Sequence, residues 1–309
     1  MKLGYGAWGI GKFMWLGAED DESLRALARA FELGVDFVDT ALGYGEGHSE
    51  RLVGEAVRSF GGGIRVATKI PPKNYQWPAR SGVPADEAFP ATWVVKCTET
   101  SLRNLGLDAI DVQQFHVWSD EWVGRGSWLE AVEQLKADGK IRRFGVSIND
   151  HQPENALKLL ETGVVDSVQV IYNVFDQRPA DRLFPATLEQ GVDVIVRVPF
   201  DEGSLTGRIR PDTEFPEGDW RNDYFRGERK QQVWDRVTAI AEELGVPLES
   251  MPEIALRFCL SHPAVTSVIP GMRSVRNVEA NVAAAERGPL DEETLAVLAR
   301  HRWDRNFYG

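Results

Sequence analysis

Short runs of β-branched and other apolar residues alternate along the chain with amphipathic stretches that end at a glycine or a polar break. Uninterrupted apolar runs are typical of strands buried on both faces of a parallel sheet, and the stretches between them are typical of crossover helices. The runs lie at residues 3–8, 35–40, 64–70, 110–117, 143–148, 167–172, 193–198 and 265–270. Eight such units predict an α/β protein that folds as a (β/α)8 TIM barrel.

The helical stretches show the expected spacing of apolar positions. Residues 22–33, ESLRALARAFEL, predict a helix whose apolar face consists of Leu24, Leu27, Ala28 and Phe31. Gly34 follows directly and suits the left-handed conformation in which many helices end. This helix is expected to be part of the scaffold.

Two connections are too long for plain barrel loops. They cover residues 71–90 after the third predicted strand and residues 199–228 after the seventh. Both contain Trp or Tyr, and both follow the carboxyl end of a strand, which is where barrel enzymes build their sites. No repeat or interdomain linker interrupts the pattern, so we expect a single domain over residues 1–309 with long loops at its C-terminal face.

Composition supports a soluble globular protein. The 309 residues are 43% hydrophobic and 27% charged, and the formal net charge of −12 argues against a nucleic-acid surface. The chain has no window of 18 apolar residues and no signal peptide at its start, so we expect a cytoplasmic protein that does not enter a membrane. Cys97 and Cys259 have no metal-ligand spacing and are expected to be structural.

Polar residues stand at the carboxyl ends of three predicted strands, where buried strands usually remain apolar. They are Asp39 at the end of the second strand, Tyr44 shortly after it, Lys69 on the third strand and His116 on the fourth. One interpretation is a buried Asp39–Lys69 salt bridge with a hydrogen-bonded His116, since a buried charge is costly unless it is paired. The other interpretation is a shared site, because these strand ends converge on the same mouth of a barrel.

Together the four side chains have the properties of a general-acid system. Free tyrosine has a pKa of about 10 and is a poor acid near neutrality, but an adjacent ammonium stabilises the phenolate and an imidazole can share the proton. Asp39 would orient Lys69 and keep it charged. The group suits protonation of an oxygen that becomes negative during a reaction, as a carbonyl oxygen does when hydride arrives.

The same residues carry a resemblance to a known family. The sequence resembles the aldo-keto reductase superfamily, whose catalytic Asp, Tyr, Lys and His match DTALGYG, TKI and QQFH here, with GEGHSERLVGEAV behind the first element. The resemblance extends from Gly4 to Asn281. It implies that Tyr44 is the proton donor, that Lys69 and Asp39 tune it, and that His116 orients the carbonyl oxygen.

The resemblance also implies that NADPH binds across the barrel mouth. GVSIND supplies Ser147 and Asn149, and QVIYN supplies Gln169, for the nicotinamide carboxamide, whereas VRVPFDEGSLTGR is similar to the strand and loop that cover the pyrophosphate. Ile148 stands where many members have Asn. Arg197 stands where an aromatic residue often stacks on the nicotinamide; its guanidinium can stack there too, or it can point elsewhere to a carboxylate.

A third cofactor element, VIPGMRSVRNVEAN, is similar to the family segment that grips the adenosine phosphate. Ser274 can cap the helix there, and Arg273 and Arg276 can pair with a 2′-phosphate, which favours NADPH over NADH. Asn277 replaces a common Arg. The full set of expected cofactor contacts is Trp8, Ser147, Asn149, Gln169, Arg197, Gly203, Leu205, Gly207, Gly271, Arg273, Asn277 and Asn281.

Tryptophans are candidates for an apolar wall beside the substrate. Trp77 lies in the first long connection and Trp118 follows His116 closely, while Trp8 ends the first predicted strand. Packing in the core is the alternative for each of them. We expect a small-molecule carbonyl as the substrate, and sugars, metabolite ketones and reactive aldehydes all fit this expectation.

Two other functions are alternatives to carbonyl reduction. A metal-dependent barrel hydrolase needs several converging ligands, but His48, His151, His262 and His301 fall in helix or loop segments, so no metal is expected. The alternative is a cofactor-sensing or binding protein on the same barrel with little turnover, as in the potassium-channel beta subunits that resemble this family. The complete catalytic set favours an NAD(P)H-dependent aldo-keto reductase.

Overall fold

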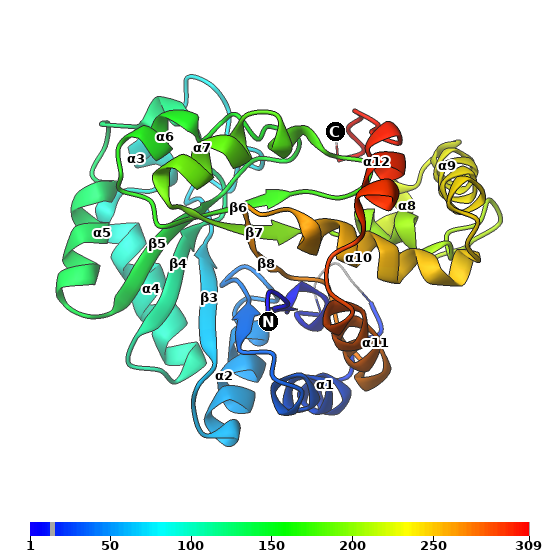
Figure 1. Cartoon of the computed structure of the whole chain (residues 1–309). Coiled ribbons are helices and arrows are strands. Elements are labelled where there is room, and N and C mark those ends of the chain that lie inside the picture. The colour runs from blue at the N-terminus through cyan, green and yellow to red at the C-terminus, as the bar shows by residue number, and fades with distance from the viewer. Residues whose placement is uncertain (13–15, 309) are drawn as a thin grey trace.

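The computed structural model describes residues 1–12 and 16–308. Within these residues eight strands hydrogen-bond in chain order as one parallel sheet, which curls as Figure 1 shows. The strands are β1 (Tyr5–Gly6), β2 (Phe37–Asp39), β3 (Arg65–Ile70), β4 (Ile110–Phe115), β5 (Ile141–Ser147), β6 (Ser167–Ile171), β7 (Asp193–Arg197) and β8 (Val265–Val268). The prediction of eight parallel strands surrounded by helices is confirmed.

Backbone contacts join the first and last strands and close the sheet. Leu3 and Gly6 form parallel bridges to Val268 and Gly271, and the amide of Gly6 donates to the carbonyl of Pro270 over 3.0 Å. A Cβ atom on Gly6 would lie 2.5 Å from the carbonyl oxygen of Ile269. Only glycine allows the backbones to approach this closely, so Gly6 is required for closure.

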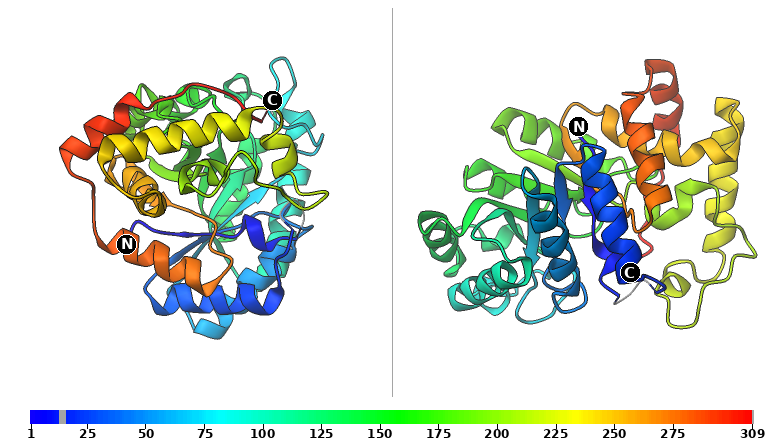
Figure 2. Two further views of the ribbon diagram at one scale, coloured as in Figure 1. Left: turned by 90° about the vertical axis from the view of Figure 1, so that its right-hand side faces the viewer. Right: turned by 90° about the horizontal axis from the view of Figure 1, so that it is seen from below.

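Helices cover the outer face of the curled sheet (Figures 1 and 2). Helix α1 lies beside both α2 and α11, and α4 contacts both α2 and α5. The helices are α1 (Asp20–Glu32), α2 (His48–Phe60), α3 (Ala85–Ala88), α4 (Ala91–Leu105), α5 (Trp128–Ala137), α6 (Leu157–Glu161), α7 (Leu183–Gln190), α8 (Arg221–Tyr224), α9 (Arg229–Leu244), α10 (Met251–Ser261), α11 (Val275–Glu286) and α12 (Glu292–Arg300). In the described part of the chain, no helix has the length and apolar character needed to span a bilayer.

Helix α1 illustrates why these segments are helical. Its first turn carries acidic residues, which interact favourably with the positive end of the helix dipole. Leu27 and Phe31 are buried as predicted, Leu24 is half-buried, and Ala28 is exposed, so the buried face is rotated slightly from the predicted one. Gly34 has φ +85°, in agreement with the predicted left-handed end.

Alternate residues along the strands face the inside of the barrel, and these positions change from apolar to polar along β2, β3, β4 and β7. The apolar layer consists of Phe37, Ala67, Val112, Ile195 and Ile269, which form a cluster separate from the outer core. Two residues further along the same strands stand Asp39, Lys69, Gln114 and Arg197. Because side chains two apart lie on the same face, a polar layer rests on the apolar one at the carboxyl ends of the strands.

Candidate active site

Asp39 and Lys69 form the centre of the polar layer. Lys69 Nζ donates to Asp39 Oδ1 over 2.5 Å and to the carbonyl of Thr40 over 2.8 Å. The side chains are 3% and 1% exposed, so the pair is fully buried. Burial acts to lower the pKa of Lys69, but its attraction to Asp39 and Tyr44 outweighs burial and raises that pKa above 10.5. Lys69 is therefore a fixed positive charge.

Tyr44 lies next to this charge. Lys69 Nζ is 3.3 Å from the Tyr44 hydroxyl and 4.9 Å from the centre of its ring. Burial raises the pKa of Tyr44 above 10.0, and the Lys69 ammonium only partly offsets that rise. Lys69 thus lowers the pKa of Tyr44 as expected, but in this structure the lowering is smaller than the rise caused by desolvation. Tyr44 keeps its proton through neutral pH.

His116 lies on the other side of the Tyr44 ring. The two rings meet edge to face with their centres 5.6 Å apart. Burial, together with the charges of Lys69 and Arg197, holds the pKa of His116 well below 6.5. Its Nδ1 is buried and has no hydrogen-bond partner among the described residues. A neutral imidazole in this position can donate one hydrogen bond to an oxygen placed beside Tyr44.

Two glutamines hold the Asp39 carboxylate from the opposite side. The amide nitrogens of Gln114 and Gln169 both donate to Asp39 Oδ2, over 3.0 and 2.8 Å. Gln169 was expected to contact the cofactor, whereas Gln114 was not among the predicted residues. The signal for Gln114 was available, because it stands two residues beyond Val112 on the inward face of β4 and opposite Lys69 in the register.

The candidates for the carboxamide follow β5 and β6. Ser147 is buried at the end of β5, and its register partner on β6 is Gln169. The side chain of Asn149 instead bonds the main chain of Ala79 at both its nitrogen and its oxygen, each over 3.1 Å. Asn149 therefore ties the 71–90 connection to the end of β5.

Arg197 ends β7 beside these groups. Its guanidinium donates to Asp150 Oδ1 over 2.6 Å and to the carbonyl of Ile148 over 3.0 Å. Its Nε is buried and has no partner within residues 1–12 and 16–308. Of the two interpretations of Arg197, the structure has the one in which the side chain points to a carboxylate. The ion pair with Asp150 fixes the plane of the guanidinium. Asp150 was not among the predicted residues.

The segment after β7 turns sharply. Gly203 and Gly207 have left-handed φ angles of +103° and +67°, and Leu205 between them is fully buried. Asp201 and Glu202 are buried charged residues that precede them. Neither was predicted, because acidic residues in a long polar connection are usually solvated.

The third cofactor element lies at the start of α11. The side chain of Ser274 accepts from the backbone amide of Asn277 and caps the helix as predicted. Arg273 precedes the cap and donates to the carbonyl of Leu16 over 2.9 Å. Asn281 is buried one turn further along α11, and Gly271 ends the bridge to β1. The helix therefore presents its amino end beside an arginine.

The candidate tryptophans occupy different environments. Trp77 is 45% exposed and packs edge to face on His116, with ring centres 5.8 Å apart. Trp8 lies 6.5 Å from Tyr44 and 5.5 Å from Trp220, measured between ring centres. Trp118 is completely buried among other aromatic rings and donates to Asp120. A substrate cannot reach Trp118 in this structure, so the expected substrate contact is replaced by a core position.

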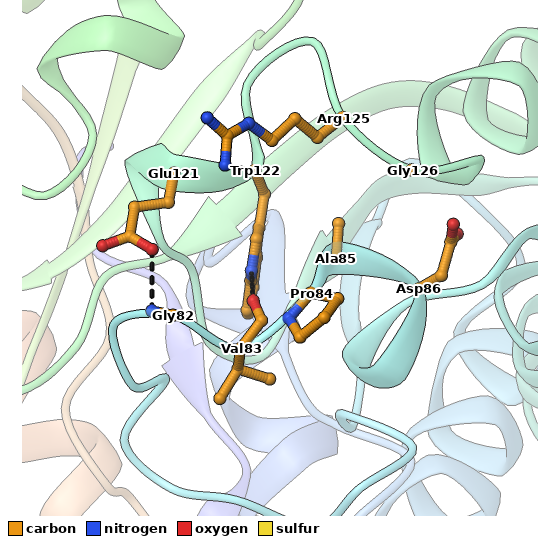
Figure 3. Close-up of a pocket in the computed structure, with 9 residues that line it drawn as sticks. All are labelled: Gly82, Val83, Pro84, Ala85, Asp86, Glu121, Trp122, Arg125 and Gly126. Atoms are coloured by element: carbon orange, nitrogen blue, oxygen red, sulfur yellow. Dashed lines mark hydrogen bonds between the residues drawn. The ribbon is translucent and has the colours of Figure 1, made fainter.

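A small recess lies between the 71–90 connection and the segment after β4. Its volume is about 220 Å³, and its walls are Gly82–Asp86, Glu121, Trp122, Arg125 and Gly126, as Figure 3 shows. Glu121 accepts from the amide of Gly82 over 2.8 Å, and the indole of Trp122 donates to the carbonyl of Val83 over 2.7 Å. These bonds anchor the 71–90 connection beside β4.

Metal ligands do not gather anywhere in residues 1–12 and 16–308, where no three His, Cys, Asp or Glu side chains form a candidate ion site. The polar groups at the centre of the site are those of Tyr44, Lys69, Asp39 and His116.

The chain matches the model of the aldo/keto reductase family over residues 2–302. It is 30% identical over 291 residues to the uncharacterized oxidoreductase YqkF of Bacillus subtilis. The matched region covers 93% of this chain and 90% of that protein. The holo form of aldo-keto reductase AKR11C1 from Bacillus halodurans has a TM-score of 0.74 at 28% identity, covering 97% of this chain and 92% of that one.

A second solved structure is similar in fold. The glycerol dehydrogenase AKR11B4 from Gluconobacter oxydans has a TM-score of 0.77 at 27% identity, and the likeness covers 99% of this chain and 93% of that chain. Sequence and fold comparisons thus extend over the same nearly complete length.

Proposed function

Because the chain belongs to the aldo/keto reductase family, we propose that it reduces an aldehyde or ketone to an alcohol, with NADPH as the hydride donor and Tyr44 as the proton donor. The observation that carries this proposal is the buried contact between Tyr44 and the Lys69–Asp39 pair, with His116 against the same ring. The similar glycerol dehydrogenase is named for the oxidation of an alcohol, which is the reverse direction of the same chemistry.

The residues present fit a nicotinamide dinucleotide. The amide nitrogen of Gln169 donates to Asp39 and Gln114, so its amide oxygen remains available to accept from a carboxamide. Ser147 is the register partner of Gln169 on the neighbouring strand. The buried Nε of Arg197 has no partner among the described residues and is available as a further hydrogen-bond donor. The capped start of α11, with Arg273 before it, suits the 2′-phosphate of NADPH, because helix amides and a guanidinium both favour an anion.

Bound NADPH would supply a hydride to the carbonyl carbon. The chain's own residues act on the oxygen. His116, neutral at physiological pH, donates a hydrogen bond that orients the carbonyl oxygen, and Tyr44 transfers its hydroxyl proton to that oxygen as negative charge develops. Lys69 stabilises the resulting phenolate, and Asp39 keeps Lys69 in place. The substrate therefore leaves as the alcohol, and Tyr44 regains a proton from solvent.

Both long connections are proposed to line the mouth of this site. Trp77 from the 71–90 connection touches His116, and Trp220 from the 199–228 connection touches Trp8 beside Tyr44. They would supply an apolar wall for the substrate. The 201–207 turn is proposed to cover the pyrophosphate.

The proposal is tested by incubating the purified protein with NADPH and a panel of aldehydes and ketones that includes sugars, short ketones and reactive aldehydes. We expect consumption of NADPH with at least one carbonyl and formation of the matching alcohol. NADPH binding without turnover across the whole panel would contradict the proposal and favour a sensing role.

A further inference from the structure

The turn after β7 has an unusual backbone. Val198, Asp201 and Glu202 have left-handed φ angles of +57°, +51° and +56°, and Gly203 follows at +103°. Residues with side chains rarely adopt this conformation, and a β-branched residue such as Val198 does so least readily. Such strain persists only where the surrounding structure holds it, and it is concentrated at ligand clamps and active sites. The contacts that hold this turn therefore bear on its role.

Two of these contacts come from the last five residues of the chain. Arg305 forms an ion pair with Asp201, and the two side chains are 7% and 1% exposed. The hydroxyl of Tyr308 donates to Glu202 Oε1. Figure 2 shows the C-terminal end of the chain beside the 199–228 connection. Asp201 and Glu202, which are adjacent in this strained turn, are thus both held by the C-terminal segment.

The ring of Tyr308 also joins two sides of the barrel mouth. It lies 5.7 Å from His151, which follows β5, and it stacks on Trp220 of the 199–228 connection, with centres 6.0 Å apart and planes at 11°. Trp220 in turn contacts Trp8, and Trp8 contacts Tyr44. A row of aromatic rings therefore runs from the C-terminal segment to the proposed proton donor.

The two acidic residues are held unequally. Asp201 has a cation as its partner, whereas Glu202 has only the Tyr308 hydroxyl and no ion pair within the described residues. The groups around Glu202 are Tyr308, Asp201, Arg197, Asp150 and Tyr224. Burial raises the pKa of Glu202 to about 7, so this carboxyl group changes charge near neutral pH while it is enclosed. Glu202 is therefore held by a single hydrogen bond, whereas Asp201 is held by an ion pair.

We propose that Arg305 and Tyr308 are positioning residues that hold the 198–207 turn closed over the cofactor, and that the Tyr308–Glu202 contact opens whenever the cofactor exchanges. The inference rests on the proposed function, in which this turn covers the pyrophosphate. Arg305 keeps the turn attached through Asp201, and Tyr308 acts as the latch. Because Glu202 takes up a proton on enclosure, the closed turn is favoured at low pH and loosens as the pH rises.

The test measures the rate at which NADPH leaves the protein, followed by cofactor fluorescence after mixing with excess competing cofactor. Tyr308→Phe removes one hydroxyl and keeps the ring, so the ring contacts with His151 and Trp220 are preserved. We expect it to speed NADPH dissociation by roughly threefold to tenfold, the range that the loss of one hydrogen bond produces. Tyr5→Phe is the matched control, since Tyr5 is buried in the outer core and its hydroxyl has no hydrogen-bond partner among the described residues, and it should leave the rate unchanged.

The pH dependence separates a latch from a merely structural contact. Dissociation from the unmodified protein should accelerate as the pH rises through about 7, and Glu202→Gln, which imitates the protonated acid, should remove that acceleration. If NADPH binds but its dissociation is the same in Tyr308→Phe, the latch is refuted while the proposed function stands. If NADPH does not bind at all, both are refuted.

Discussion

Asp39 and Lys69 depend on each other more than any other charged pair of the proposed site. They lie inside the barrel without access to solvent, and each has further partners that its charge satisfies: Gln114 and Gln169 on Asp39, and Thr40 and Tyr44 on Lys69. A buried charge that loses its counter-ion is strongly destabilising, whereas the intact pair contributes little net stability. The pair therefore contributes to the chemistry of the proposed site rather than to stability, and the fold accommodates each charge only when the other is present.

This interdependence predicts the outcome of a double-mutant cycle. Asp39→Asn and Lys69→Met should each lower the free energy of unfolding by about 3–5 kcal/mol, because each leaves a buried charge unpaired. The double variant should lose clearly less than the sum. Urea denaturation measures all of these values.

The exposed pair of Asp36 and Arg65 is the control for that cycle. Their side chains are 48% and 52% exposed, and the corresponding variants should change stability by less than about 1 kcal/mol. Small, additive losses at Asp39 and Lys69 would contradict the account of a buried, mutually dependent pair.

The four central residues could be recognised from the sequence because strand ends in a parallel barrel converge on one mouth. Their order along the chain was then sufficient to identify them as one site. The directions of other side chains could not be read in this way. Trp118 lies only two residues beyond His116 but is buried in the outer core, and the amide of Asn149 bonds the 71–90 connection. Such directions depend on how neighbouring segments pack, which spacing along the chain does not express.

At the scale of elements, the strands were predicted in the right number and order, but most are shorter than their apolar runs. β7 stops at Arg197 because Val198 adopts a left-handed conformation. β8 stops at Val268, shortly before Pro270, which lacks an amide to donate to a neighbouring strand. The short helices α6 and α8 have too few turns for a periodic pattern. The turn after β7 is the element whose behaviour depends most on its surroundings.

That turn predicts a pH-dependent stability. The pKa of Glu202 is raised by burial to about 7, above the value of 4.5 usual for glutamate. The folded protein therefore holds a proton that the unfolded chain has already lost between these values, and stability falls as the pH rises through this window. Glu202→Gln should match the unmodified protein near pH 4.5 and exceed its free energy of unfolding by about 1–3 kcal/mol above pH 7.

Denaturant unfolding at a series of pH values checks this expectation. Glu217→Gln is the control, since Glu217 lies exposed in the same connection and its loss should add no pH dependence. An equal stability difference at all pH values would show that the Glu202 carboxyl group does not change its charge on folding.

Over the whole molecule, the two ends of the chain are brought into the same structure. The first strand pairs beside the last one, and the C-terminal segment beyond α12 reaches back to the turn after β7. We therefore propose that residues 1–309 form a single domain. Closure of the barrel followed from the strand pattern, but the return of the C-terminal segment did not, because its aromatic and charged residues have no periodicity and acquire their roles only through contacts distant in sequence.

The central claim is that this barrel reduces a carbonyl compound with a proton from Tyr44. The most direct measurement compares Tyr44→Phe with the unmodified protein, following NADPH oxidation with a reactive aldehyde and, in the same samples, NADPH binding by fluorescence. We predict that reduction falls by about a hundredfold to ten-thousandfold, the range typical of a lost general acid, while binding is retained. Equal rates of reduction in the two proteins would contradict the account.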